Sequence, residues 1–245
     1  MRLIGPSLPL AAPALGGVFG LAALVVVLAM APLSLVLGDR AGAAGLSAAQ
    51  VSGTVWRGRL SDAAYRGLRL GEVRLGLSPL SLLAARPRLT FAGEVATGAA
   101  RLGRGAVELI DVDAALPLGQ LAPASGLAGT VRMVGLSLDL RGGECRRAGG
   151  QVSLADISLA GLQLPGLVLA GDPACAGASL ALPLRGQAEG VDVQADLLIG
   201  ADGGYQMDMI LRTSRPEVEA ALGMAGYERT LNGHRRRWIG RLGQP

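Results

Sequence analysis

Apolar and polar side chains alternate one by one in several parts of the chain, and this period of two is the feature that most limits how it can fold. The alternating segments are residues 72–77, 136–141, 191–197 and 205–211. In the second segment, for example, three leucines alternate with Ser137, Asp139 and Arg141. Successive side chains of a strand point to opposite faces, so each segment predicts a strand with one apolar and one polar face. Asp202-Gly203-Gly204, between the last two segments, indicates a hairpin turn.

Glycines separate the alternating segments. The chain contains 38 of them, and they recur roughly every 8–12 residues, as expected of an antiparallel meander. Glycine also permits bulges and bends within strands. We therefore predict a mainly β fold with a curved antiparallel β-sheet.

Two places in the chain carry helical signals. Residues 78–83 begin with Ser-Pro, which can cap and start a short turn. Ser214 and Glu217 have capping-box spacing ahead of residues 218–222, and Gly226 can end that helix. The predicted sheet thus carries one or two short helices.

The N-terminal part of the chain is apolar and has no charged residue between Arg2 and Asp39. Residues 18–37 are nearly all aliphatic, and about 20 apolar residues in a helix are enough to cross the hydrocarbon core of a bilayer. We predict a single transmembrane helix over residues 15–38, after a short cytoplasmic segment at residues 1–14.

A cleaved signal peptide is the competing interpretation of this segment. Ala41-Gly42-Ala43 offers a possible cleavage site, but the apolar run is longer than a usual signal-peptide core. Arg2 precedes the helix, whereas one acid and one arginine nearly cancel after it, which favours a cytoplasmic N-terminus. Residues 39–50 are then a linker, and residues 51–245 form a β-rich domain in the periplasm of a bacterial cell, attached to the inner membrane.

The charge and composition exclude some classes of partner. The formal net charge is +4, and arginine supplies the cationic side. The basic residues alternate with acids and lack interleaved aromatics, so nucleic acid is a poor candidate. Aromatic residues make up 3% of the chain, which argues against an aromatic-lined active-site pocket.

Cys145 and Cys175 are the only two cysteines. An isolated pair without CxxC spacing or accompanying histidines is a poor metal site. The periplasm would oxidise such a pair, and closing this loop would stabilise the fold by about 3–4 kcal/mol on the chain-entropy model. A structural disulfide is favoured over the alternative of two unpaired buried thiols.

Signals for enzymatic chemistry are weak. His234 is the only histidine; its neighbouring arginines should lower its proton affinity, and we expect it to be exposed and solvated. Asp111 and Asp113 could bind a cation or act as an acid and base, but on one face of a strand a water-facing pair is expected. No hydrolase elbow, phosphate loop or dinucleotide motif occurs. We expect no catalytic, metal-binding or cofactor-binding residue and no small-molecule substrate.

Several motifs of the chain resemble a known family. Residues 51–60 read Val-Ser-Gly-Thr-Val-Trp-Arg-Gly-Arg-Leu and are followed by Gly-Leu-Arg-Leu-Gly at 67–71 and by residues 77–83. This resembles the start of the periplasmic region of protein N of the type II secretion system, where a Gly-Thr-x-Trp-x-Gly turn follows the membrane anchor. Cys145 after a strand, residues 202–205 and the closing stretch 221–242 fit as well, so the resemblance covers essentially the whole chain. Arg57 and the cluster Arg235-Arg236-Arg237 carry more charge than the family pattern requires.

Within the Gly53-Thr54-Val55-Trp56-Arg57-Gly58 stretch, local chemistry favours a structural role. Gly53 and Gly58 allow tight turns, and Trp56 can bury a large area and hold the first hairpin in place. The alternative is that Trp56 anchors a partner protein, since tryptophan is favoured at interface hot spots.

The resemblance implies an accessory component of the apparatus that moves folded periplasmic proteins through an outer-membrane secretin. It implies contacts with other components, such as the secretin and the inner-membrane platform, and no catalytic residues. A second hypothesis is an envelope lipid-binding or lipid-transfer protein with an apolar groove on its curved sheet. The excess of aliphatic residues over what one compact core would use, together with the bending glycines, motivates it.

Overall fold

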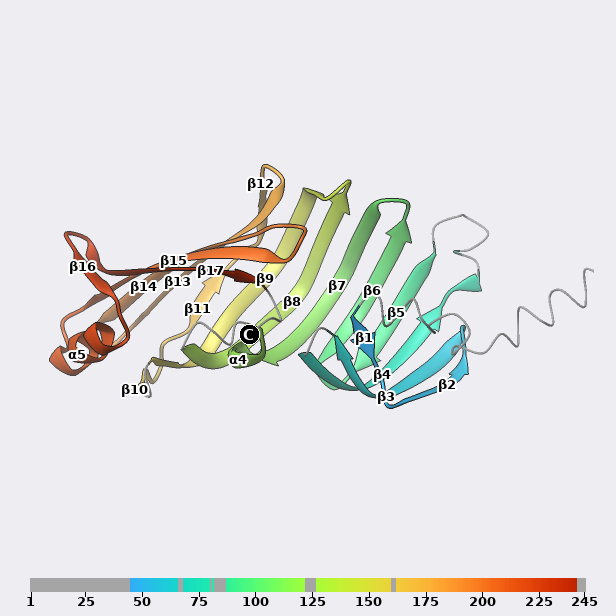
Figure 1. Ribbon diagram of the computed structural model, residues 1–245, viewed down its shortest axis with the longest axis horizontal. Coiled ribbons are helices and arrows are strands. Elements are labelled where there is room, and N and C mark those ends of the chain that lie inside the picture. The colour runs from blue at the N-terminus through green and yellow to red at the C-terminus, as the bar shows by residue number, and fades with distance from the viewer. Residues whose placement is uncertain are drawn as a thin grey trace, which may run out of the picture.

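The chain folds into one antiparallel β-sheet of 17 strands with two short helices in its described part (Figure 1). The computed structural model describes residues 45–65, 68–79, 81, 87–121, 127–159 and 162–241. The prediction of a mainly β fold built on an antiparallel sheet is confirmed. The predicted membrane span at 15–38 lies outside these residues, and among the described helices none has the length and apolar character needed to cross a membrane.

The first part of the sheet is a meander in which, from its second strand onward, each strand pairs with the next along the chain. Its strands are β1 (Leu46–Ser47), β2 (Gln50–Thr54), β3 (Arg57–Tyr65), β4 (Leu68–Leu77), β5 (Arg88–Gly93), β6 (Ala96–Gly103), β7 (Ala106–Pro117), β8 (Leu127–Arg141) and β9 (Glu144–Leu159). β1 and β2 both pair with β3. The short helix α4 (Leu118–Leu121) connects β7 to β8.

The second part of the sheet continues from β9. Its strands are β10 (Leu162–Gln163), β11 (Leu169–Gly171), β12 (Ala174–Ala176), β13 (Ser179–Ala188), β14 (Val191–Ile199), β15 (Gly204–Thr213), β16 (Glu228–Thr230) and β17 (Gly233–Arg241). β13, β14, β15 and β17 pair in that order, and β16 pairs with the outer edge of β17. The helix α5 (Pro216–Met224) lies between β15 and β16.

The second part of the sheet folds back over β8 and β9, so that two layers face each other (Figure 1). The main core fills the space between the layers and joins side chains of β8, β9 and β11 to those of β13, β14, β15, β17 and α5. Ala195, Val218 and Leu222 are completely buried in it. A smaller cluster around Leu60 and Ala63 packs beneath β1.

The fold-back occurs at β11, which pairs with β9 on one side and with β13 on the other through Ala170 and Arg185. We call this the crease. A Cβ atom on Gly171 would lie 1.8 Å from the carbonyl oxygen of Pro183, and one on Gly186 would lie 2.1 Å from that of Val168. Only glycine fits at both positions, because the backbones of β11 and β13 approach each other so closely.

The four alternating segments form strands as predicted, with their apolar residues on the inner face of the sheet. They are parts of β4, β8, β14 and β15. The hairpin turn between β14 and β15 is confirmed: the amide of Gly203 donates to the carbonyl of Gly200, and the amide of Gly204 donates to Asp202 Oδ1 at 3.0 Å.

Aspartates, as well as glycines, produce the bulges of the sheet. Asp62, Asp111 and Asp156 have positive φ values of 50°, 47° and 54°. Each lies where its strand carries one more residue than the partner strand. Aspartate tolerates this left-handed conformation better than most residues because its short side chain can form local hydrogen bonds. From the sequence, such bends were expected at glycines.

α5 confirms the predicted C-terminal helix but not its predicted cap. The helix begins at Pro216 with Arg215 as N-cap and no side-chain capping bond, so the capping box of Ser214 and Glu217 does not form. Proline is favoured at the first helical position, which moves the start past Ser214. The helix ends before Gly226, as predicted, with the amide of Tyr227 bonded to the carbonyl of Leu222.

Of the turn predicted at 78–83, residues 80, 82 and 83 lie outside the described part of the chain. The amide and the hydroxyl of Ser81 both donate to the carbonyl of Ser78, at 3.1 and 2.6 Å. This bonding is that of a single turn.

Candidate functional site

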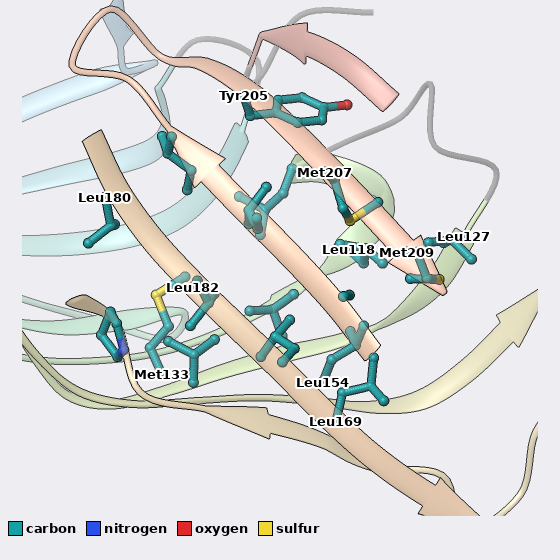
Figure 2. A pocket seen from close by; sticks show the side chains of 18 of the residues that line it. Leu118, Leu127, Met133, Leu154, Leu169, Leu180, Leu182, Tyr205, Met207 and Met209 are labelled. Carbon is teal, nitrogen blue, oxygen red and sulfur yellow. The ribbon is translucent and has the colours of Figure 1, made fainter. Parts of the chain in front are cut away.

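An apolar cavity of about 170 Å³ lies between the two layers of the sheet (Figure 2). Side chains of β8, β9 and β11 line one side, those of β13, β14 and β15 line the other, and α4 contributes Leu118 and Leu121. Figure 2 shows Met133 of β8 and Leu182 of β13 directed toward each other from opposite layers. Every lining side chain that the structure describes is aliphatic, a thioether or proline, except for the phenol of Tyr205.

A second, more open compartment of about 440 Å³ adjoins this cavity. The two compartments share Leu121, Leu180 and Ile199. Leucines of β7 and β8 and the glycine-rich β14–β15 turn line the second compartment, and Tyr65 and Gln120 bring polar groups to it. We call the two compartments together the apolar trough.

The chemistry of the trough suits binding. Its described lining contains no carboxylate, histidine, cysteine or guanidinium group, and the phenols of Tyr65 and Tyr205 are the titratable side chains there. Elsewhere in the described part of the chain, no cluster of three or more His, Cys, Asp or Glu residues is placed to hold a metal ion.

The residues of the family-like motif lie on the β2–β3 hairpin. Thr54 and Arg57 form the last pair before a two-residue turn that ends with Trp56. Gly53 has a φ of +86°, and a Cβ there would lie 2.3 Å from the carbonyl oxygen of Arg57. Gly58 is buried opposite Gly53. Trp56 is half-buried and, with Arg57, lines a shallow depression at this end of the sheet.

Cys145 and Cys175 are joined by a disulfide, with 5.5 Å between their Cα atoms. The bond connects β9 to β12 and therefore lies beside the crease. Next to it, the amide of Cys145 donates to the carbonyl of Ala178 at 3.0 Å. The disulfide therefore links the two parts of the sheet on either side of the fold-back.

Two arginines of the 235–237 cluster bind the same carboxylate. On the outer face, Arg235 Nε donates to Asp208 Oδ1 at 2.7 Å, and Arg237 Nη2 donates to Asp208 Oδ2 at 2.8 Å. The hydrogen bonds from Arg235 and Arg237 outweigh the effect of burial and lower the pKa of Asp208 to about 2. These two arginines therefore hold β17 against β15.

Arg236, between them, points to the inner face of β17. Its guanidinium lies 4.9 Å from the ring centre of Trp238 and 5.9 Å from that of Tyr227, and it donates to the carbonyl of Ala225. The two rings meet edge to face at 5.7 Å. Burial raises the pKa of the Tyr227 hydroxyl above its usual value, against the opposing charge of Arg236. The arginine cluster thus has a structural role that the family pattern did not indicate.

His234 is mostly buried, so the prediction of an exposed, solvated histidine is wrong. Its side chain is 12% exposed, and Nε2 lies 3.9 Å from Glu219 Oε1. The alternation along β17 turns His234, Arg236 and Trp238 to the inner face, where His234 lies near Glu219 of α5. The sequence showed the neighbouring arginines but not which way this strand faces.

Asp111 and Asp113 are both exposed. Asp113 Oδ1 accepts a hydrogen bond from the amide of Gly135 at 2.8 Å. Asp111 occupies the bulge of β7, so the regular strand on which their shared face was predicted is interrupted there. In the structure, Asp113 therefore binds a backbone amide, and Asp111 lies in a bulge.

Sequence reasoning indicated an apolar groove but did not place it. The signal was the abundance of aliphatic residues, and the alternating segments in β8, β14 and β15 do supply part of the lining. The short strand β11 and the fold-back that brings β13–β15 over β8 depend on contacts between distant residues. No local pattern reveals them.

Fold and trough together define the class of protein: a mainly β protein whose single antiparallel sheet folds back over an apolar cavity. The family model for type II secretion system (T2SS), protein N, matches residues 44–236. The chain belongs to this family and is a component of the type II secretion system, as its sequence motifs predicted. Neither the curated proteins nor the solved structures contain a match.

Proposed function

We propose that this chain is an accessory, non-catalytic scaffold of the type II secretion system. Residues 15–38 would anchor it in the inner membrane, and the β domain at 51–245 would lie in the periplasm. There it would support the export of folded proteins by contacting the secretin or the inner-membrane platform. The family match over residues 44–236, which spans nearly all of the folded domain, carries this proposal.

The outer edge of β17 is the surface we propose for these contacts. Among the described strands, only β16 pairs with this edge, and it covers Gly233–Arg235. From Arg236 to Arg241 the backbone is therefore open to a strand of a partner protein. Ile239, on the outer face of the same stretch, is 77% exposed.

Secretion by living cells tests the proposal. In a strain that lacks the natural chain, the wild-type chain and an Ile239→Lys variant are each expressed, and a secreted enzyme is measured in the medium and in the periplasm. A lysine at a strand edge opposes pairing with another strand. We expect the variant to leave more of the enzyme in the periplasm. A photoreactive residue at Arg241 should crosslink the wild-type chain to another secretion component.

Leu231→Lys is the matched control, because Leu231 is also exposed but lies in the β16–β17 turn, away from the open edge. It should secrete as well as the wild type. If removal of the whole chain left secretion unchanged, the scaffold function would be wrong. If removal of the chain impaired secretion but the Ile239→Lys variant secreted like the wild type, the function would stand and the proposed surface would be wrong.

Lipid handling is a second candidate function, and the apolar trough favours it. A scaffold that only makes protein contacts has no need for an apolar cavity beside a more open compartment. Recovery of phospholipid without secretion proteins, after detergent extraction and purification of the full chain, would support this second function over the first.

A further inference from the structure

We propose that the apolar trough binds an acyl chain of a membrane phospholipid. The inner compartment lies between the two layers of the sheet and is lined by hydrocarbon and thioether groups, with one phenol. A polar ligand placed there would lose its hydrogen bonds to water without replacement, which is costly. The part of the ligand that enters the trough must therefore be apolar.

The lining of the trough follows one strand over a length that a linear chain could occupy. It follows β8 from Leu127 to Leu136 in the inner compartment and continues to Leu138 and Leu140 in the second. At about 3.3 Å per residue, the first of these stretches is up to about 30 Å long. An acyl chain spans one leaflet, which is about half of the 30 Å hydrocarbon core of a bilayer. The trough is therefore long enough to hold one chain along β8.

The lining can also adapt to a ligand. Met133, Met207 and Met209 contribute three flexible thioether side chains from both layers of the sheet. Methionine side chains rearrange easily and fill irregular apolar spaces. Two compartments of about 170 and 440 Å³ together fall within the range of about 300–1,000 Å³ typical of ligand pockets.

The arrangement of the two compartments favours a phospholipid over a free apolar molecule. The inner compartment is lined by apolar side chains apart from Tyr205, whereas the second is more open and carries Tyr65, Gln120 and the backbone of the Gly200–Gly203 turn. A ligand with an apolar tail and a polar head matches this change from an apolar to a more polar lining along the trough. The predicted membrane anchor would hold the domain beside a bilayer, where phospholipids are the abundant molecules of this kind.

Photocrosslinking in cells tests the proposal with a matched pair of positions on β14. A benzophenone amino acid replaces Leu197, which lines the trough, or Leu198, which faces outward and is 41% exposed. The full chain is expressed in cells grown with radioactive phosphate, irradiated, and purified under denaturing conditions. We expect phosphate label and the added mass of a diacyl phospholipid on the Leu197 variant, and loss of both on the Leu198 variant.

Other results would overturn the proposal. Equal labelling from Leu197 and Leu198 would indicate nonspecific contact with the bilayer. An adduct at Leu197 with an acyl chain but no phosphate would indicate a free fatty acid, and an adduct to protein, including another part of this chain, would indicate a different occupant. An unlabelled Leu197 variant that resists limited proteolysis like the wild type would show that the trough holds no phospholipid.

A second pair on β15 covers the case in which the Leu197 variant does not fold. Met207 lines the trough, and Gln206 is exposed on the opposite face of the same strand. Phospholipid should crosslink to the benzophenone at Met207 and not to that at Gln206, and the reverse result would contradict the proposal. Secretion of the enzyme is measured in the same strains. Lipid labelling does not depend on whether the chain supports export, so failure of the lipid proposal can be distinguished from failure of the scaffold function.

Discussion

The charge of Asp208 should contribute to the stability of the C-terminal strands, because it joins β15 to two arginines of β17. Its side chain is 18% exposed and binds both Arg235 and Arg237, which keep its pKa at about 2. We predict that Asp208→Asn lowers the free energy of unfolding at pH 7 by about 1 kcal/mol, less than the shift alone would give because water screens the site. Urea unfolding followed by tryptophan fluorescence measures the change.

The contribution of Asp208 to the free energy of unfolding should depend on pH in a defined direction. The folded-state pKa of Asp208 lies below the ordinary value, so its contribution is present above about pH 4 and is lost as the pH falls toward 2. The difference between the wild type and Asp208→Asn should therefore shrink over that range. Asp196→Asn is the control, because its ion pair with Arg185 is far more exposed and should contribute little. A constant difference down to pH 2 would contradict the assigned pKa.

Two features of Gly53, its positive φ and its close backbone contact, disfavour any side chain there, and a comparison with Gly105 separates their effects. Its φ is +86°, and an added Cβ would also collide with the carbonyl of Arg57. Gly105 has a φ of +68° with nothing within 4 Å of an added Cβ. Gly105→Ala should cost about 1 kcal/mol for the conformation alone, whereas Gly53→Ala should cost about 2–3 kcal/mol because the collision adds to it. Equal losses in urea unfolding would show that the hairpin relaxes around the new methyl group.

At the scale of single residues, the sequence predicted orientation where alternation is regular and failed where it is interrupted. The inner positions of β14 and β15 follow directly from their period of two. The left-handed conformations of Asp62, Asp111 and Asp156 do not, because aspartate is equally compatible with a regular exposed position. The orientation of His234 depends on the pairing of β17 with β15, which is a contact between residues far apart in the chain.

The crease is the structural element on which the arrangement of the two layers depends. Cβ atoms at Gly171 or Gly186 would lie within about 2 Å of backbone carbonyl oxygens, as given above, and backbone cannot move aside as a flexible side chain can. We predict that Gly171→Ala and Gly186→Ala each lower the free energy of unfolding by about 3 kcal/mol or more. Limited proteolysis should then cut the chain near residues 160–190.

A strand glycine without such contacts provides the control for the crease. Gly149 in β9 has nothing within 4 Å of an added Cβ. Gly149→Ala should leave stability unchanged or raise it slightly, because alanine restricts the unfolded chain more than glycine does. A comparable loss for Gly149→Ala would mean that alanine is poorly tolerated throughout these strands, and the crease would have no special sensitivity.

Elements with strong local signals were predicted, and those made by tertiary contacts were not. The hairpin at residues 202–204 and the end of α5 before Gly226 have turn and cap residues that act within a few positions. β11 has three residues and α4 has four, too few for a periodic pattern. Both form because neighbouring strands bring them into place, and both line the trough.

For the molecule as a whole, the sequence predicted the antiparallel sheet, and its many aliphatic residues indicated an apolar groove. It could not predict that the sheet folds back on itself, because that depends on the close approach of β11 and β13 and on which strands then face each other. The volume and the course of the trough follow from that fold-back. The possibility of an apolar groove could thus be stated from the sequence, while the residues that line it required the structure.

The disulfide beside the crease offers a test of how firmly the two layers are held together. Cys145 is 5% exposed, so Cys145→Ala avoids placing a new polar group in the interior, and it is combined with Cys175→Ser at the less buried end. On the chain-entropy model, the double variant should lose about 3–4 kcal/mol of unfolding free energy. Reduction of the wild-type protein should give the same loss, since both treatments free the same loop.

If the layers are held mainly by their apolar core, the double variant will still resist proteolysis at residues 160–190 in the absence of urea. Cleavage there without denaturant would instead show that the fold-back, and with it the trough, depends on the covalent link.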